Sequence, residues 1–286
     1  MRIRLRPMTA DDIGPLTDAI VADHWGERRS WFEFVVGHPA CRPLVAVDDA
    51  GRQLGSAVAT VNGPVAWIGT IWVVPDRRRE GIGERLTVAV LDVAEDAGCR
   101  TSVLVATEVG RPLYEKLGFE LQTSIVVVEA PGTGADASGA AAAGRTDPRV
   151  RPFRPDDLEA MARIDLAATG EDRRHLLRAF ATPASATVLD DPVHGLGGFV
   201  VRPAWGGGAT IAPDPDVALA LLEARRRRTS PDRHVRAGVL AENASGIARL
   251  VDAGWSEAWR APRLVRGAPL TWQPEAIWGQ FNHALG

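Results

Sequence analysis

The sequence predicts a two-domain chain of the α/β class, with a mixed sheet in each domain. Three observations support this: the opening stretch recurs near the middle of the chain, strand and helix patterns alternate in both halves, and a segment of small residues separates the halves. The length of 286 residues suits two domains of about 140 residues each.

The pattern that opens the chain recurs near its middle. Residues 4–8 (RLRPM) are followed by a pair of aspartates, and residues 149–153 (RVRPF) are followed by another such pair. Each copy predicts a short strand, a turn and a helix with acidic residues in its first turn. Residues 113–119 (LYEKLGF) match 249–255 (RLVDAGW), and in both a helix stops at glycine before an aromatic residue. Two matches in the same order indicate two copies of one fold.

Hydrophobic periodicity and turn residues predict the elements of each half. In the first half we expect a strand at 2–6, helices within 10–36, strands near 43–48, 54–61 and 65–74, a loop at 75–82, a helix at 83–97, a strand at 101–106, a helix at 110–117 and strands after 119. The second half repeats a thinner version, with strands near 186–190, 197–202, 208–212 and 234–239.

Residues 131–147 are almost entirely Ala, Gly, Ser and Asp, which predicts a flexible linker because such a segment has little to bury. We therefore expect an N-terminal domain at 1–130 and a second domain at 148–286. The Trp-rich segment 272–283 is expected to pack across a domain face, and a ligand site there is the alternative.

Composition excludes several functional classes. The chain is 45% hydrophobic and 24% charged, with a formal net charge of −3, so the electrostatic footprint of a nucleic-acid-binding protein is missing. No apolar run approaches the roughly 20 residues that span a bilayer, and no secretory leader is apparent, so we expect a cytoplasmic protein without a membrane partner. Cys41 and Cys99 lack metal-ligand spacing, so we expect reduced, buried thiols and no metal.

The segment most informative about chemistry follows an apolar run. Residues 66–74 predict a strand buried on both faces, which Pro75 ends, and a turn containing Gly81 and Gly83 then leads into an amphipathic helix. Unpaired N–H groups and the dipole of a helix N-terminus attract anions, and glycine lets a phosphate approach the backbone. Taken alone, the segment fits either a phosphate-binding loop or a tight surface turn capped by glycine.

A second motif, GRPLYEKLGF at residues 110–119, lies downstream. Together the two segments resemble the GNAT N-acetyltransferase superfamily: residues 78–83 (RREGIG) match its acyl-CoA signature Q/R-x-x-G-x-G/A, and residues 113–119 match its L-Y-x-x-x-G-F motif. The resemblance covers about residues 2–129. It implies two GNAT-like domains, each a mixed, mostly antiparallel sheet flanked by helices.

The resemblance also implies acetyl-CoA as the acyl-donor co-substrate. Backbone N–H groups around the two glycines would hold its pyrophosphate, and the end of the preceding strand would pair with the pantetheine arm and support the developing oxyanion. The cofactor-binding residues implied in this way are Val73, Val74, Arg78, Arg79, Gly81, Ile82, Gly83, Glu84 and Thr107.

Tyr114 is the one tyrosine of the chain. The resemblance implies that it protonates the departing CoA thiolate as a general acid. From the residues alone, a helix residue that packs its ring against the sheet is the alternative. Many relatives carry Asn seven residues before this tyrosine, where this chain has Thr107, whose hydroxyl can still donate and accept a hydrogen bond.

The general base stays open at this point. A primary amine, with a pKa of about 8 to 10, must lose a proton before it attacks the thioester. The central strand offers Thr70 and Trp72 but no acid. Residues bordering the acceptor site in similar proteins, and one further acid, are weak candidates, each with a surface role as the alternative: His24, Trp25, Glu27, Trp31 and Glu108.

The second half has lost the corresponding features. Its strand-to-helix junction at 209–214 leads into 215–219 (PDVAL) without a glycine, so little room remains for a pyrophosphate. Leu250 stands where the first half has Tyr114, and Asn243 is more simply explained as a helix N-cap than as a ligand. The pattern resembles tandem GNAT proteins whose second domain is degenerate and completes the acceptor pocket or stiffens the fold.

These features favour an N-acetyltransferase that moves an acetyl group from acetyl-CoA to a primary amine of a small molecule or peptide, by direct attack on the thioester. We expect a monomer or homodimer. One alternative is a tandem enzyme similar to mycothiol synthase, acting on a bulky glycoside amine. Another is a non-catalytic acyl-CoA-binding or sensing protein, against which the retained Tyr114 argues.

Overall fold

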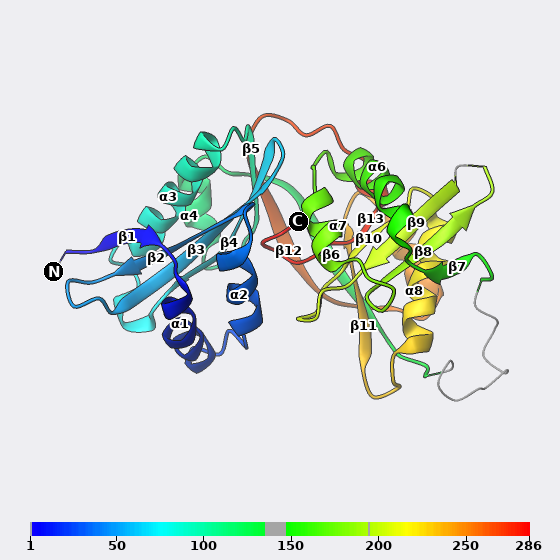
Figure 1. Ribbon diagram of the computed structural model, residues 1–286, viewed down its shortest axis with the longest axis horizontal. Coiled ribbons are helices and arrows are strands. Elements are labelled where there is room, and N and C mark those ends of the chain that lie inside the picture. Colours follow the sequence, from blue (N-terminus) through cyan, green and yellow to red (C-terminus); the bar gives the residue numbers. More distant parts are fainter. Residues whose placement is uncertain (1, 135–146, 194) are drawn as a thin grey trace. The chain divides into compact units, whose positions relative to one another are not determined.

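The computed structural model describes residues 2–134, 147–193 and 195–286, whose elements are labelled in Figure 1. The chain divides into two compact units. Unit 1 comprises Met1–Leu121, Leu264–Pro269 and His283–Gly286, and unit 2 comprises Gln122–Arg263 and Leu270–Asn282.

Unit 1 contains a mixed sheet with helices around it. Its strands are β1 (Arg4–Pro7), β2 (Cys41–Val47), β3 (Gln53–Asn62), β4 (Val65–Val73) and β5 (Thr101–Val105). Its helices are α1 (Ala10–Ala22), α2 (Arg29–Gly37), α3 (Ile82–Asp96) and α4 (Arg111–Lys116), with a 3-10 turn, η1 (Pro75–Arg77), between β4 and α3. The strands from β1 to β4 are antiparallel neighbours, and β5 is parallel to β4.

Helix α3 is fixed by its apolar face. The buried side chains of Ile82, Leu86 and Val90 recur every four residues, and they join one core cluster with Ala57 and Ile68 from the sheet. The burial of this stripe holds the N-terminus of α3 beside the end of β4, which is where the sequence predicts the cofactor site.

Unit 2 is built from more strands and a second set of helices. Its helices are α6 (Leu158–Thr169), α7 (Arg174–Phe180), α8 (Pro215–Arg228) and α9 (Ala244–Asp252), with the short turns η2 (Pro155–Asp157) and η3 (Pro274–Ala276). Its strands are β6 (Glu120–Pro131), β7 (Val150–Pro152), β8 (Ala186–Asp191), β9 (Gly195–Val201), β10 (Ala209–Ile211), β11 (His234–Leu240), β12 (Ser256–Gly267) and β13 (Ile277–Gly279).

The strands form two sheets. One has the order β1-β2-β3-β4-β5-β12-β6-β11, and the other has the order β13-β10-β9-β8-β7. Both the expected elements of the first half and the four strands expected in the second half are present, which confirms the mixed α/β class and the helix-flanked sheets.

The sequence repeat has a structural counterpart. In the first copy, Arg6 pairs with Asp12 at 2.7 Å, and the same carboxylate accepts a hydrogen bond from the Thr9 amide. In the second copy, Arg151 pairs with Asp157 at 2.8 Å, and that carboxylate accepts from the Arg154 amide. Each pair ties the first strand of its half to the start of the following helix.

The compact units differ from the predicted linear domains. The strand β6 pairs with β11 along Ile125–Pro131, so this part of the first half belongs to unit 2. In return, Leu264–Pro269 belongs to unit 1, where Ala268 exchanges hydrogen bonds with Arg100 (2.9 Å) and Thr101 (2.7 Å). Strand pairing joins residues far apart in sequence, so composition alone could not place these segments. Most of the predicted linker, residues 135–146, lies outside the described residues.

The Trp-rich segment packs as part of unit 2. Trp278 in β13 is fully buried, and its indole N–H donates to the Ala212 carbonyl at 3.0 Å. Across the described ranges of the chain, we find no helix with the length and apolar character needed to cross a membrane.

Candidate functional site

The loop between β4 and α3 presents unpaired backbone amides at the start of a helix. Arg79 and Gly81 have positive φ angles of 68° and 77°, and the first hydrogen bond of the helix runs from the Arg85 amide to the Gly81 carbonyl at 3.0 Å. The amides from Arg79 to Glu84, which we call the anion loop, donate to no group in the described part of the chain. Unpaired amides at a helix N-terminus form a site for phosphate.

The two glycines of the anion loop have different roles. A Cβ on Gly81 would meet nothing within 4 Å, so its positive φ, not lack of space, favours glycine there. A Cβ on Gly83 would lie 3.7 Å from Val73 and 3.8 Å from Leu113, which is ordinary contact. The fold therefore tolerates a methyl group at Gly83, and the absence of a larger side chain there leaves the backbone open to a ligand.

Basic side chains surround the anion loop. Arg77 is neutralised by Glu80, with Nε and Oε1 2.7 Å apart, and Lys116 of α4 pairs with Glu84 at 2.7 Å. Arg79 is exposed, and its guanidinium has no partner among the described residues. One cation beside the anion loop is thus available to a phosphate.

The last part of β4 has an open edge. β4 pairs with β3 as far as Val73, but with β5 only at Val65–Trp67. The Val74 amide donates to Leu54 of β3 at 2.9 Å, and because successive strand residues direct their polar groups to opposite sides, the Val73 carbonyl points away from β3. This edge can accept an extended ligand arm as another strand would.

Tyr114 lies on α4 and packs against the same core cluster as Val73 of β4. Its ring packs against Gly110, where an added Cβ would lie 3.0 Å from the ring, and meets Phe119 edge-on at 6.1 Å between centroids. Burial raises the pKa of Tyr114 to about 12, because phenolate loses its hydration there. The phenol is therefore fully protonated at neutral pH and can act as a donor.

The structure brings the predicted residues together from three elements. The space beside Gly83 is bounded by Val73 of β4 and Leu113 of α4, and the Glu84–Lys116 ion pair joins α3 to α4. Val73, Val74 and Tyr114 also pack against the same core cluster. The anion loop, the end of β4 and the start of α4 are therefore neighbours.

Thr107 has a local role in the structure. Its side chain is exposed, and its hydroxyl accepts a hydrogen bond from the Gly110 amide at 3.1 Å, at the start of α4. The predicted contact of Thr107 with the cofactor stays a prediction.

The early helical segment contains an acid that the sequence did not single out. Asp23, directly after α1, accepts a hydrogen bond from the Trp72 indole at 2.8 Å and forms an ion pair with Arg78. These partners are far from Asp23 in sequence, and no local motif marks the residue. Trp31 of α2, another residue named from the sequence, donates to the Thr70 hydroxyl at 3.0 Å.

The other candidate bases have less support. Glu27 accepts hydrogen bonds from the amides of Arg28 and Arg29 at 2.8 and 2.6 Å, so its carboxylate caps the start of α2. His24, Trp25 and Glu108 are exposed, and their predicted roles stay predictions.

The second half differs at the corresponding helix N-terminus. The side chain of Asp214 accepts a hydrogen bond from the Asp216 amide at 2.8 Å, so a carboxylate of the chain already occupies the start of α8. Leu250 is fully buried, and Asn243 caps α9 through the Gly246 amide at 2.9 Å, which confirms its predicted N-cap role.

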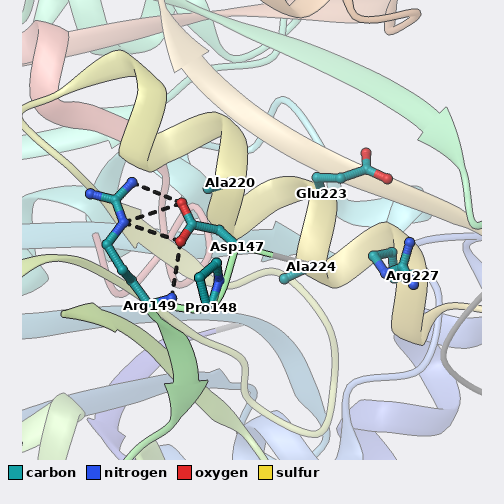
Figure 2. Close-up of a pocket in the computed structure, with 7 residues that line it drawn as sticks. All are labelled: Asp147, Pro148, Arg149, Ala220, Glu223, Ala224 and Arg227. Atoms are coloured by element: carbon teal, nitrogen blue, oxygen red, sulfur yellow. Dashed lines mark hydrogen bonds and ion pairs between the residues drawn. The ribbon is translucent and has the colours of Figure 1, made fainter. Parts of the chain in front are cut away.

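A surface hollow in unit 2 is a different feature. Figure 2 shows its lining, in which the Asp147 carboxylate faces the Arg149 guanidinium, 2.8 Å away. The lining residues are Asp147, Pro148, Arg149, Ala220, Glu223, Ala224 and Arg227. None of the predicted site residues lines it, and its acids and bases offset each other, so it does not mark a site for one class of ion.

Sequence comparisons are consistent with this geometry. Residues 10–119 match the model of the Acetyltransferase (GNAT) family. The chain is also similar to the uncharacterized N-acetyltransferase YitH of Bacillus subtilis (strain 168), with 26% identity over 230 residues that cover 78% of each chain.

Solved structures share the fold over nearly the whole chain. A putative acetyltransferase from Pyrococcus horikoshii has a TM-score of 0.80 at 21% identity, covering 99% of this chain and 96% of its own. A GCN5-related N-acetyltransferase from Sphaerobacter thermophilus scores 0.62 at 18% identity, covering 94% and 98%. A tandem GNAT protein from the clavulanic acid biosynthesis pathway scores 0.61 at 16% identity, covering 94% and 99%.

Proposed function

We propose that the chain, whose residues 10–119 match the Acetyltransferase (GNAT) family, transfers an acetyl group from acetyl-CoA to a primary amine of a small molecule or peptide. The family makes the chain an acyltransferase. The observation that supports the site most strongly is the anion loop beside the open edge of β4.

The residues of this region fit acetyl-CoA, the acyl donor. The unpaired amides of the anion loop and the free guanidinium of Arg79 suit a pyrophosphate, and the edge at Val73 and Val74 suits an amide-containing arm. Bound acetyl-CoA would supply the activated thioester. The residues that would hold it are those named from the sequence: Val73, Val74, Arg78, Arg79, Gly81, Ile82, Gly83, Glu84 and Thr107.

The proposed reaction needs one proton donor from the chain. In the proposed reaction the neutral amine nitrogen bonds to the thioester carbonyl carbon and the carbon–sulfur bond breaks. The nitrogen passes one proton to water, and the thiolate gains one from the chain, whose donor is then reprotonated by water. Tyr114 is the donor to the sulfur, because its hydroxyl is protonated at neutral pH and its helix adjoins β4. A backbone amide at the end of β4 supports the developing oxyanion.

The proposal is tested by release of free thiol. The purified chain is mixed with acetyl-CoA and a panel of primary amines that includes phenethylamine, n-butylamine, spermidine and a tripeptide beginning with alanine. We expect amine-dependent thiol release and a product heavier by one acetyl group. If acetyl-CoA binds but no amine causes thiol release, the proposed enzyme activity is contradicted and a non-catalytic acyl-CoA-binding protein is favoured.

The same assay distinguishes the proposed function from the alternative of a tandem enzyme similar to mycothiol synthase. An enzyme similar to mycothiol synthase would favour a bulky glycoside amine, so glucosamine and an amino-glycoside of an inositol belong in the panel. A preference for these over the simple amines would favour that alternative.

A further inference from the structure

We infer that Asp23 binds the positively charged ammonium group of the acceptor and so directs the amine toward the end of β4. The inference rests on the proposed function, and it supplies the acid that the central strand lacks. Asp23 lies in unit 1, directly after the end of α1.

The carboxylate of Asp23 is held in place and still has a free oxygen. The Trp72 indole donates to Oδ2 at 2.8 Å, and Trp72 is itself only 1% exposed, so the anchor is rigid. Arg78 contacts the same Oδ2, whereas Oδ1 accepts no hydrogen bond from any residue that the structure describes. The side chain is 15% exposed, so a ligand can reach it.

A cation of the chain itself contacts the Asp23 carboxylate. The Arg78 guanidinium donates through Nε to the Val73 carbonyl at 3.0 Å and through its terminal nitrogen to Asp23. It therefore spans the open edge of β4 and the carboxylate. A substrate ammonium offers the same charge and the same kind of donor, so the Asp23 carboxylate is suited to bind it.

Arg78 is also the first residue of the Q/R-x-x-G-x-G/A motif. A diphosphate at the anion loop would compete with Asp23 for this guanidinium, because both are anions and phosphate pairs well with arginine. Binding of the donor would thus free a carboxylate that faces the strand edge. The acceptor ammonium is the cation that replaces Arg78.

The role assigned to Asp23 is recognition. A carboxylate is a far weaker base than an alkylamine, so a salt bridge orients the ammonium without removing its proton. Asp23 is therefore a substrate-binding residue. Its loss is expected to raise the KM of the amine more than it lowers kcat.

The test compares charged and neutral probes on the full chain saturated with CoA. Calorimetry measures binding of phenethylammonium and of 2-phenylethanol, which share a ring and differ in charge. In Asp23→Asn the amide oxygen still accepts from Trp72 while the charge is lost, so we expect about tenfold or greater weakening for the ammonium and little change for the alcohol. The matched control is Asp18→Asn, an exposed acid on α1, which should leave both affinities unchanged.

A second variant separates the anchor of the carboxylate from its charge. Trp72→Phe keeps the Asp23 charge and removes its anchoring N–H, so it should weaken ammonium binding by an intermediate factor and leave the affinity for the alcohol little changed. Because a fully buried ring becomes smaller, the melting temperature of this variant should fall by several degrees. The proposed role of Asp23 is excluded if Asp23→Asn binds phenethylammonium with the same affinity as wild type. It is also excluded if no ammonium probe of the panel binds the CoA-saturated wild-type chain.

Failure of the two proposals can be told apart. If wild type releases thiol and Asp23→Asn has an unchanged KM for the amine, the role of Asp23 is rejected and the proposed acetyl transfer is retained. If ammonium binding depends on Asp23 but no thiol is released, the ammonium-binding role of Asp23 is retained and the proposed acetyl transfer is rejected.

Discussion

At the scale of single residues, the site depends on groups that are held in one state. Burial keeps the Tyr114 phenol protonated, and left-handed backbone at Arg79 and Gly81 turns the amides of the anion loop outward. Asp23 is held by the Trp72 indole. Each of these is a local arrangement that one substitution can remove.

The first prediction concerns Tyr114→Phe. The ring would still pack against Gly110 and Phe119, but the proton donor would be absent. We expect kcat to fall by about 100-fold or more, with the Kd of acetyl-CoA changed less than about threefold. Calorimetry and steady-state kinetics measure the two quantities. Full turnover in the variant would show that Tyr114 only packs.

The second prediction concerns pH. A general acid works while it is protonated, and burial raises the pKa of Tyr114 from 10.0 to about 12. At saturating amine, kcat should therefore stay level as the pH passes 10 and fall only toward 12. A fall centred at or below pH 10 that disappears in Tyr114→Phe would contradict the raised pKa.

At the scale of elements, the strand β4 organises unit 1. One edge of β4 pairs with β3 along its length, the other is open beyond Trp67, and α3 begins directly after its end. On β4, Gly69 packs against the segment His283–Gly286: an added Cβ would lie 2.4 Å from the Ala284 Cβ. The Asn62 side chain donates to the Leu285 carbonyl at 2.8 Å and holds the same segment.

The third prediction follows from this contact. Gly69→Val should lower the free energy of unfolding by about 1 to 3 kcal/mol, because the side chain must displace Ala284. Urea denaturation measures the change. The matched control is Gly14→Ala within α1, where an added Cβ meets nothing within 4 Å and should be neutral or stabilising by up to about 1 kcal/mol. Equal stability of Gly69→Val and wild type would mean that the segment does not pack on β4.

The elements could largely be predicted from the sequence, because periodicity and turn residues act locally. The apolar run before Pro75, the glycines that follow and the amphipathic pattern of α3 predict a strand, a turn and a helix, and these are present. Asp23 could not be found in this way. Its partners Trp72 and Arg78 lie 49 and 55 residues away, and only the packing of the helix pair on the sheet brings them together.

At the scale of the whole molecule, the chain contains two copies of one starting motif that differ in what they keep. The Arg–Asp pair recurs in both, as Arg6–Asp12 and Arg151–Asp157. The anion loop does not recur: the matching helix of unit 2 is capped by Asp214. We propose that unit 2 binds no acetyl-CoA, because this carboxylate would repel a pyrophosphate.

The fourth prediction concerns the division of the chain. A fragment of residues 148–286 lacks β6, the strand between β12 and β11 in the sheet order. We expect the fragment to show no cooperative thermal transition, because the polar edges of both neighbours would lose their partner. Circular dichroism against temperature measures this. A sharp, reversible transition would show that the second half folds without the strand.

The most direct test of the central claim is a calorimetric titration of acetyl-CoA into Gly81→Glu and Gly98→Glu. Both positions have a positive φ, 77° and 86°, and open space around an added Cβ, so the strain is matched, but only Gly81 lies in the anion loop. We predict one acetyl-CoA site per chain in wild type and in Gly98→Glu. In Gly81→Glu, where a carboxylate would repel the pyrophosphate, we predict at least a 100-fold loss of affinity, about 2.7 kcal/mol. Equal binding by the two variants would contradict the assignment of this loop as the acetyl-CoA site.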